Sequence, residues 1–179
     1  MSSAKGAFEL LLDLEQSNSQ SREIAEQQLL NSGLFQYVRF RVADSYLMVK
    51  VNSISEILPL PAVTQVPFTK PWVVGVSNIR GDVIPISDFS QYLFQRTTEK
   101  NKKNKLIILK GKGFSTAVLV DEVIGMTDVI ENDIVTDISE IEEQIKPYII
   151  GTVTRDEHSY GVMDSKALLT ESGFMKAAI

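Results

Sequence analysis

Several residue types and patterns are scarce or missing in this 179-residue chain. It has no cysteine, which excludes disulfides and thiolate metal sites and fits a reducing compartment. Its single histidine, His158, has no second histidine with which to form a metal site. No stretch approaches the roughly 18 apolar residues that span a bilayer, and the N-terminus lacks a basic region followed by an apolar one. We therefore expect a cytoplasmic protein without direct membrane insertion.

Charge is unevenly distributed within a net charge of −5. Seven basic residues and one acid lie between Arg96 and Lys112, whereas nine carboxylates and no base lie between Asp121 and Glu143. Solvated loops are the simpler interpretation of both segments, and an acidic partner for the basic one is the alternative. Nucleic-acid binding is not expected, because the chain is acidic and only Phe114 accompanies its basic stretch.

The sequence contains no motif that indicates an enzyme. The chain has no Gly-x-Ser-x-Gly elbow, and His158 lies in a charged segment typical of an exposed turn. The run from Lys110 to Gly113 lacks the spacing of a phosphate-binding loop. Asp121 and Glu122 are adjacent in a predicted strand, so their side chains point to opposite faces. We predict neither an enzyme, nor a cofactor, nor a metal site.

Alternating apolar and polar residues predict about ten short strands and little helix. Because ten strands in one sheet are unusual, we predict a mainly β fold of two side-by-side five-stranded β-barrels. The first barrel is placed at about residues 35–95, the second at about 105–163, and a terminal helix at 165–171. Asp88 and Asp164 are predicted helix N-caps. Which strands cross between the barrels stays open.

The stretch from Trp72 to Phe89 predicts a β-hairpin. Gly81-Asp82 is the predicted turn, because glycine supplies the positive φ of a tight two-residue loop. Arg80 then stands at the tip, on the more polar face. Pro85 cannot donate a ladder hydrogen bond, which indicates an edge or bulged strand.

Residues 1–33 form a different region, predicted to be an N-terminal helical arm. Phe8, Leu11 and Leu12 recur at helical spacing, and a second helical pattern runs from Ser21 to Leu30. The pattern fits equally well a partly disordered arm and an appendage that docks on the domain or on a partner.

Several motifs between Phe35 and Leu169 occur in an order that resembles the CheW-like domains, the coupling proteins of bacterial chemosensory arrays. They are Ile54-Ser-Glu-Ile57, Val66-Pro67, Gly75-Val-Ser-Asn-Ile-Arg-Gly81, Val83-Ile-Pro-Ile-Ser-Asp88, Leu119-Val-Asp-Glu-Val123, Tyr148-Ile-Ile-Gly151 and Val162-Met163-Asp164.

This resemblance implies a non-catalytic adaptor between the cytoplasmic tip of methyl-accepting chemoreceptors and the regulatory domain of a sensor histidine kinase. It places the receptor tip in a cleft between the barrels. Trp72, close before Gly75, looks like the PilI-like variant that serves type IV pilus systems and twitching motility. The alternatives are a flagellar chemotaxis coupler, or a catalytic or small-molecule-binding protein that uses the cleft.

The resemblance also assigns partner-binding positions, which are carried over residue by residue: Arg80, Gly75, Ile54, Glu56, Ile57 and Asn78. Each has a structural alternative. Ile54 and Ile57 are slightly better explained as core residues, although Asn52-Ser53 also predicts a short helical turn from Ile54 to Leu58. Gly75 could relieve crowding in a strand. Arg80 could form an ion pair that closes the hairpin onto the protein.

Overall fold

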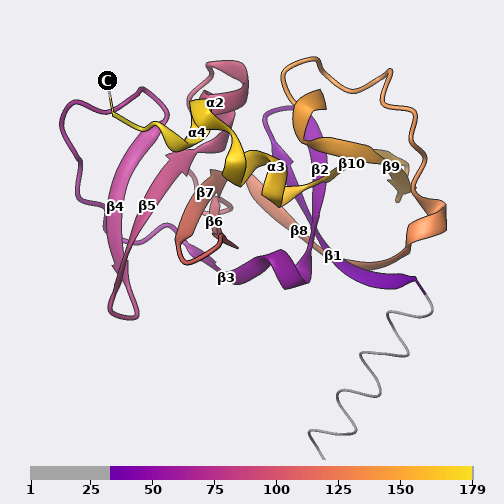
Figure 1. The fold of residues 1–179 in the computed structure, drawn as a ribbon, viewed down its shortest axis with the longest axis horizontal. Helices are drawn as coiled ribbons and strands as arrows, with labels where there is room; N and C mark the ends of the chain where they lie inside the picture. Colours follow the sequence, from indigo (N-terminus) through magenta and orange to yellow (C-terminus); the bar gives the residue numbers. More distant parts are fainter. Residues whose placement is uncertain (1–32, 179) are drawn as a thin grey trace, which may run out of the picture.

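The computed structural model describes residues 33–178, which form two five-stranded sheets and several short helices (Figure 1). Sheet A contains, in spatial order, β8 (Glu122–Ile130), β1 (Leu34–Val42), β2 (Ser45–Lys50), β10 (His158–Met163) and β9 (Ile149–Arg155). Sheet B contains β3 (Ile54–Pro59), β6 (Lys105–Lys110), β7 (Ser115–Val120), β5 (Asp82–Asp88) and β4 (Val73–Ile79). Both sheets are mixed, because β10 pairs with β2 and β5 with β7 in parallel.

The helices begin where the sequence indicates. Asp88 caps α2 (Phe89–Phe94) by accepting a hydrogen bond from the Gln91 amide at 3.0 Å. Asp164 caps α3 (Ser165–Thr170) through the Lys166 amide at 2.9 Å. Both predicted caps are confirmed. Within residues 33–178, the remaining helices are α4 (Ser172–Met175) and the 3-10 turns η1 (Val51–Ser53), η2 (Glu131–Asp133) and η3 (Lys146–Tyr148). The predicted N-terminal arm, apart from Gly33, lies outside the described residues.

The predicted closed barrels are wrong, although the two five-stranded units are confirmed. Over residues 33–178, the end strands of each sheet do not pair with each other. Loop residues occupy outer edge positions instead. Thr64 exchanges two 2.8 Å backbone hydrogen bonds with Val76 of β4, and Val135 does the same with Thr152 of β9 at 2.9 and 2.7 Å. These loop residues therefore form hydrogen bonds with edge-strand backbone groups that a closed barrel would pair with another strand.

The division of the chain between the two units also differs from the prediction. Residues 54–120 supply all of sheet B, whereas sheet A combines residues 34–50 with residues 122–163. The cause is the parallel pairing of β2 with β10, in which Leu47 lies opposite Gly161 and Val49 opposite Met163. This pairing joins segments more than a hundred residues apart, and no local pattern in either segment specifies it.

One apolar cluster fills the space between the two sheets. It contains Val38 and Phe40 of β1, Ile107 and Leu109 of β6, and Phe174 of α4. Figure 1 shows α3 and α4 running across the junction of the sheets. We call this cluster the shared core; its buried members are Val38, Phe40, Val42, Leu47, Val49, Ile54, Phe89, Leu93, Ile107, Leu109, Val118, Val120, Ile145, Tyr148, Ile149, Met163, Leu168, Leu169 and Phe174.

Each sheet also buries part of its other face. In β6, Leu106 and Ile108 point away from the shared core into a second cluster that includes Ile84 and Ile86. Sheet A has a third cluster around Tyr160. Because neighbouring residues of a strand point to opposite faces, the continuous apolar run of β6 follows from burial on both sides.

We expect Phe40→Ala, at a side chain that is 0% exposed, to lower the free energy of unfolding by about 3–5 kcal/mol through a buried cavity. Urea unfolding followed by circular dichroism and by Trp72 fluorescence checks this. Phe40 lies in sheet A and Trp72 beside sheet B, so both signals should shift together if the shared core couples the sheets. Separate midpoints would contradict that coupling. Val83→Ala, at a 69% exposed side chain, is the control and should change stability by less than about 0.5 kcal/mol.

Candidate functional site

The hairpin of β4 and β5 turns one residue earlier than predicted. Ile79 pairs with Asp82, so Arg80 and Gly81 are the two central residues of the turn. Their φ values of 54° and 97° are both positive, as a type I′ hairpin turn requires. The Asn78 side chain accepts a 3.0 Å hydrogen bond from the Gly81 amide. This local bond supports a conformation that arginine adopts only at some cost.

Arg80 projects from the tip and forms an ion pair with β3. Its Nη2 donates to Glu56 Oε1 at 2.7 Å; the Arg80 side chain is 79% exposed and that of Glu56 is 29% exposed. Because β3 and β4 are the two end strands of sheet B, the pair bridges the ends of the sheet. The expected alternative, an ion pair that holds the hairpin on the protein, is therefore present. Most of the Arg80 side chain remains open to solvent.

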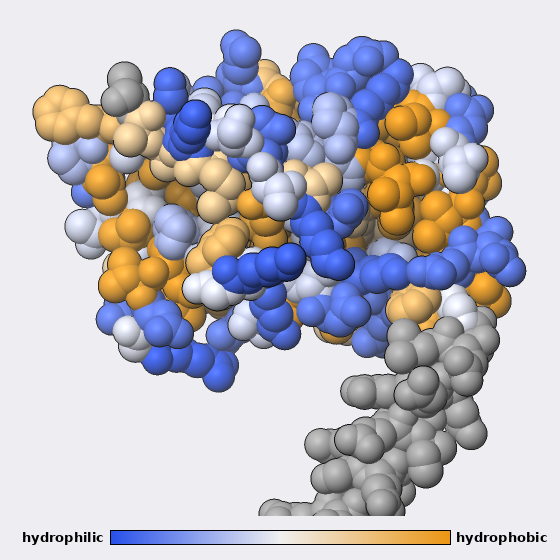
Figure 2. Space-filling model, viewed as in Figure 1, coloured by the Kyte–Doolittle hydropathy of each residue, from blue (hydrophilic) through white to orange (hydrophobic). Residues whose placement is uncertain are grey.

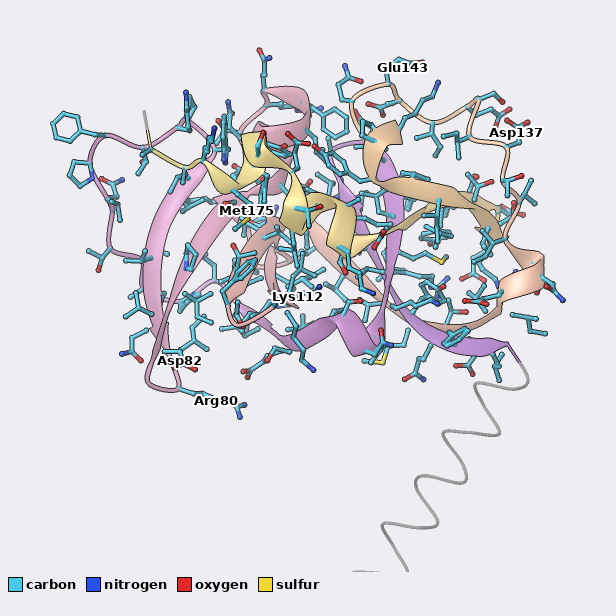
Figure 3. All side chains as sticks on the ribbon, viewed as in Figure 1. Arg80, Asp82, Lys112, Asp137, Glu143 and Met175 are labelled. Carbon is cyan, nitrogen blue, oxygen red and sulfur yellow. The ribbon has the colours of Figure 1, made fainter. Side chains whose placement is uncertain are left out.

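An open groove of about 750 Å³ lies beside this tip. It forms because β5 and β7 pair only from Ile86 and Ala117 onward, so the preceding residues diverge towards two separate hairpin tips. Its apolar walls come from Val83, Pro85, Phe114 and Met175. Figure 2 shows apolar residues gathered over this part of sheet B, and Figure 3 shows Arg80 and Asp82 at the adjoining tip. We call this the tip groove.

The tip groove and the Arg80–Glu56 pair offer two kinds of contact. Val83, Phe114 and Met175 are all partly exposed, so an apolar partner would remove their side chains from water. Asp82 and Lys110 supply opposite charges along the same groove. Phe114 and Met175 were not among the predicted partner-binding residues. Their sequence signals are weak, because Phe114 looks like an ordinary residue of the predicted strand, although it lies just before β7, and Met175 lies beyond the resembling segment.

Gly75 does not lie at the tip. It occupies β4 five residues before Arg80, about 16 Å away along an extended strand. Its φ is 144°, and a Cβ atom there would come within 2.3 Å of the Thr64 carbonyl oxygen. Thr64 is held at this distance by its hydrogen bonds to Val76. The structure thus supports the crowding explanation for Gly75.

Ile54 and Ile57 lie on a strand, so the predicted helical turn at this segment is wrong. Their backbone groups pair with β6, where Ile57 lies opposite Ile107. This long-range pairing, together with branched side chains suited to strands, outweighs the local capping signal of Asn52-Ser53. Ile54 is 8% exposed within the shared core and Ile57 packs against it. The structure therefore brings Arg80, Glu56 and Asn78 together, and it assigns the two isoleucines to the core.

Several ionisable side chains outside this tip have pKa values shifted by burial or by hydrogen bonds. Burial, followed by the charge of Glu131, raises the pKa of Tyr37 to about 12. Burial and a hydrogen bond with Tyr148 raise the pKa of Tyr92. A hydrogen bond from Arg39 lowers the pKa of the exposed Asp156 carboxyl. His158 is exposed, as expected, and stacks on Tyr46 with ring centroids 4.1 Å apart.

Residues 33–178 contain no group of three potential metal ligands, and no helix in this range is long and apolar enough to cross a membrane.

Residues 36–173 match the CheW-like domain. The chain belongs to the CheW-like family. It is therefore a non-catalytic coupling protein of chemosensory signalling. A crystal structure of the scaffolding protein TtCheW from Thermoanaerobacter tengcongensis shares its fold, with a TM-score of 0.68 and 21% sequence identity over 78% of this chain and 94% of that one.

Two curated proteins are similar to this chain in sequence. Protein PilI of Pseudomonas aeruginosa is 27% identical over 184 aligned positions, which cover 100% of both chains. The chemotaxis protein CheW of Rhizobium meliloti is 33% identical over 105 residues, which cover 59% of this chain and 68% of the relative. The alignment with PilI therefore also includes the segment before the CheW-like domain.

For this CheW-like chain, we expect Gly75→Ala to lower the free energy of unfolding by about 2–4 kcal/mol, because its methyl group would collide with the Thr64 backbone. The matched control is Gly113→Ala, where φ is +80° but no atom lies within 4 Å of the added carbon. That variant bears only the cost of the left-handed backbone, about 1 kcal/mol. Chemical denaturation compares them. Equal losses in both variants would refute the crowding explanation.

Proposed function

We propose that this CheW-like protein couples the cytoplasmic tip of methyl-accepting chemoreceptors to the regulatory domain of a sensor histidine kinase in the cytoplasm. Membership of the CheW-like family supports these two classes of partner. Arg80 and the neighbouring tip groove form the receptor-facing surface. A helical receptor tip lays an apolar stripe against Val83 and Phe114, while Arg80 fixes its register through a polar contact.

The position of Arg80 is the observation that carries this proposal. An isolated surface ion pair contributes only about 0–1 kcal/mol to stability, so the Arg80–Glu56 contact is a weak structural element. An exposed arginine beside apolar side chains is, in contrast, a frequent type of binding hot spot. Glu56 holds the guanidinium in place before the partner arrives, which reduces the entropy lost on binding.

We further propose that the system served is a type IV pilus system that controls twitching motility. The end-to-end alignment with PilI supports this assignment over a flagellar one. Trp72 supports the pilus assignment only through its resemblance to the PilI-like variant. Its ring packs edge-on against Tyr92 with centroids 5.3 Å apart, and it therefore joins β4 to α2.

The test is a reconstitution of receptor fragment, sensor kinase and this protein, with receptor affinity and kinase activity as readouts. We expect Arg80→Ala to weaken receptor binding at least about tenfold, or about 1.4 kcal/mol, and to uncouple kinase activity. Its unfolding midpoint should stay close to that of the wild type. Arg96→Ala is the matched control. The Arg96 side chain is 62% exposed, and its Nη1 lies 3.3 Å from Asp44 Oδ2. Neither residue lines the tip groove. Arg96→Ala should leave binding unchanged.

Two outcomes would contradict the proposal. Wild-type protein that binds neither receptor nor kinase would refute the adaptor function. Equal effects of Arg80→Ala and Arg96→Ala would remove Arg80 from the interface. The charge swap of Arg80→Glu with Glu56→Arg separates the two roles of the pair, because it preserves an ion pair but reverses the exposed charge. We expect this swap to fold normally and not to restore receptor binding.

A further inference from the structure

The two sheets are built on the same plan. In each, a central hairpin, β1–β2 or β6–β7, pairs antiparallel with one end strand, β8 or β3, and in parallel with a second hairpin, β9–β10 or β4–β5. A helix capped by an aspartate, Asp88 or Asp164, follows each second hairpin. Gly75 and Gly151 each lie just before the residue that exchanges hydrogen bonds with an edge loop. Each glycine also lies the same number of positions before its capping aspartate, so the second hairpins match residue by residue.

The central hairpins can be matched through their parallel partners. The residue before each capping aspartate pairs with a valine, Val118 of β7 or Val49 of β2. These two valines therefore correspond. Counting back equally along both strands matches Phe114 with Ser45.

The tip groove consequently has a counterpart in sheet A, a pocket of about 170 Å³ between the β1–β2 turn and β10. Four of its lining residues correspond to residues that line the tip groove: Asp44 to Gly113, Ser45 to Phe114, Tyr46 to Ser115, and Ser159 to Val83. The rest of its lining comes from residues 138–145, which we call the internal segment. The counterpart is smaller than the tip groove because the internal segment occupies it.

The internal segment binds there through aliphatic side chains and a carboxylate. The Ile141 amide donates a 3.1 Å hydrogen bond to the Ile138 carbonyl oxygen, and both side chains pack against the shared core. Cδ1 of Ile141 lies 3.5 Å from the position that a Cβ of Gly161 would take. Glu142 accepts a 2.7 Å hydrogen bond from the Ser45 hydroxyl. A turn with two aliphatic residues three positions apart thus fits this groove.

The corresponding stretch of sheet B is shorter. From the bridged loop residue to its partner, the chain covers 17 positions in sheet A, from Val135 to Thr152, but 12 in sheet B, from Thr64 to Val76. None of residues 65–75 lines the tip groove. The sheet B loop therefore does not fill the tip groove as the internal segment fills its counterpart.

The tip groove suits the same ligand chemistry. Phe114 and Val83 lie where sheet A has serines, so an aliphatic side chain covers more apolar surface here. Lys110 lines the groove, and Lys112 lies on the exposed turn between two lining glycines (Figure 3). Asp82 is the acidic residue of the lining. The surplus of positive charge favours carboxylates on the ligand.

We propose that the tip groove binds a partner segment with the chemistry of the internal segment, namely a turn or helix end that presents two aliphatic side chains three positions apart, flanked by carboxylates. The aliphatic side chains cover Phe114 and Val83, and the carboxylates lie beside Lys110. Applied to the receptor tip, this inference rests on the proposed function. A free peptide with the sequence of the internal segment should therefore bind the tip groove of the intact protein.

The probe is a synthetic peptide of residues 137–146, added to full-length protein whose methionine methyl groups carry carbon-13. Met175 reports on the tip groove, and Met126, which is 58% exposed on sheet A, is the reference. We expect the NMR signal of Met175 to shift saturably, with a dissociation constant in the millimolar range, while that of Met126 stays unchanged. A peptide with Ile141→Asp should not shift Met175, because a charge would replace the buried aliphatic group.

The protein variant Lys110→Glu should weaken binding of the unaltered peptide at least about fivefold, because it removes a positive charge beside the carboxylates and adds a negative one. Lys103→Glu is the matched control, since the Lys103 side chain is 70% exposed and does not line the tip groove. It should leave peptide binding unchanged. Circular dichroism checks that both variants remain folded.

An unaltered peptide that leaves Met175 unshifted, or equal shifts with both peptides, would overturn the inference. The proposed function would survive that result if Arg80→Ala still weakens receptor binding. Conversely, a peptide that shifts Met175 without displacing the receptor fragment would support the groove chemistry and remove the receptor from this groove.

Discussion

Because the side chains between the two sheets are almost entirely apolar, neither sheet can bury its inner face alone. Phe40 of sheet A and Ile107 of sheet B are both fully buried in the shared core. The helices α2, α3 and α4 add Phe89, Leu168 and Phe174 to it. The relative position of the sheets therefore depends on the hydrophobic effect more than on hydrogen bonds between them. These side chains fill the space between the strands of the two sheets.

This packing explains why the candidate site lies where strands diverge. The β4–β5 and β6–β7 hairpins diverge on the N-terminal side of Ile86 and Ala117, and the tip groove lies between them. The hairpin tip is supported by its own turn and by one exposed ion pair, so we expect changes at Arg80 to have little effect on folding. Gly75 and Ile54 differ from Arg80, because changes at either residue are expected to lower stability. Gly75 is crowded by the Thr64 backbone, and Ile54 is buried.

Local patterns were sufficient for much of the secondary structure. The alternation of Val38, Phe40 and Val42 with two arginines predicts one buried and one more polar face, and Asp88 and Asp164 predict the helix starts that are observed. Errors arose where several conformations were locally acceptable. The turn at Arg80 is displaced by one residue because positive φ is required at two positions and a bond from Asn78 supports it. Residues 54–58 form a strand because their backbone groups pair with those of β6.

The amino-acid sequence by itself determined the family, the mainly β character and the positions of most strands, since side-chain periodicity and short motifs are properties of consecutive residues. Only the tertiary structure decided that residues 34–50 join residues 122–163 in one sheet, and that Arg80 meets Glu56 while Gly75 lies apart. These relations depend on contacts between distant segments. Their free energy comes from burial and pairing in the whole fold, so no local window of residues contains the information.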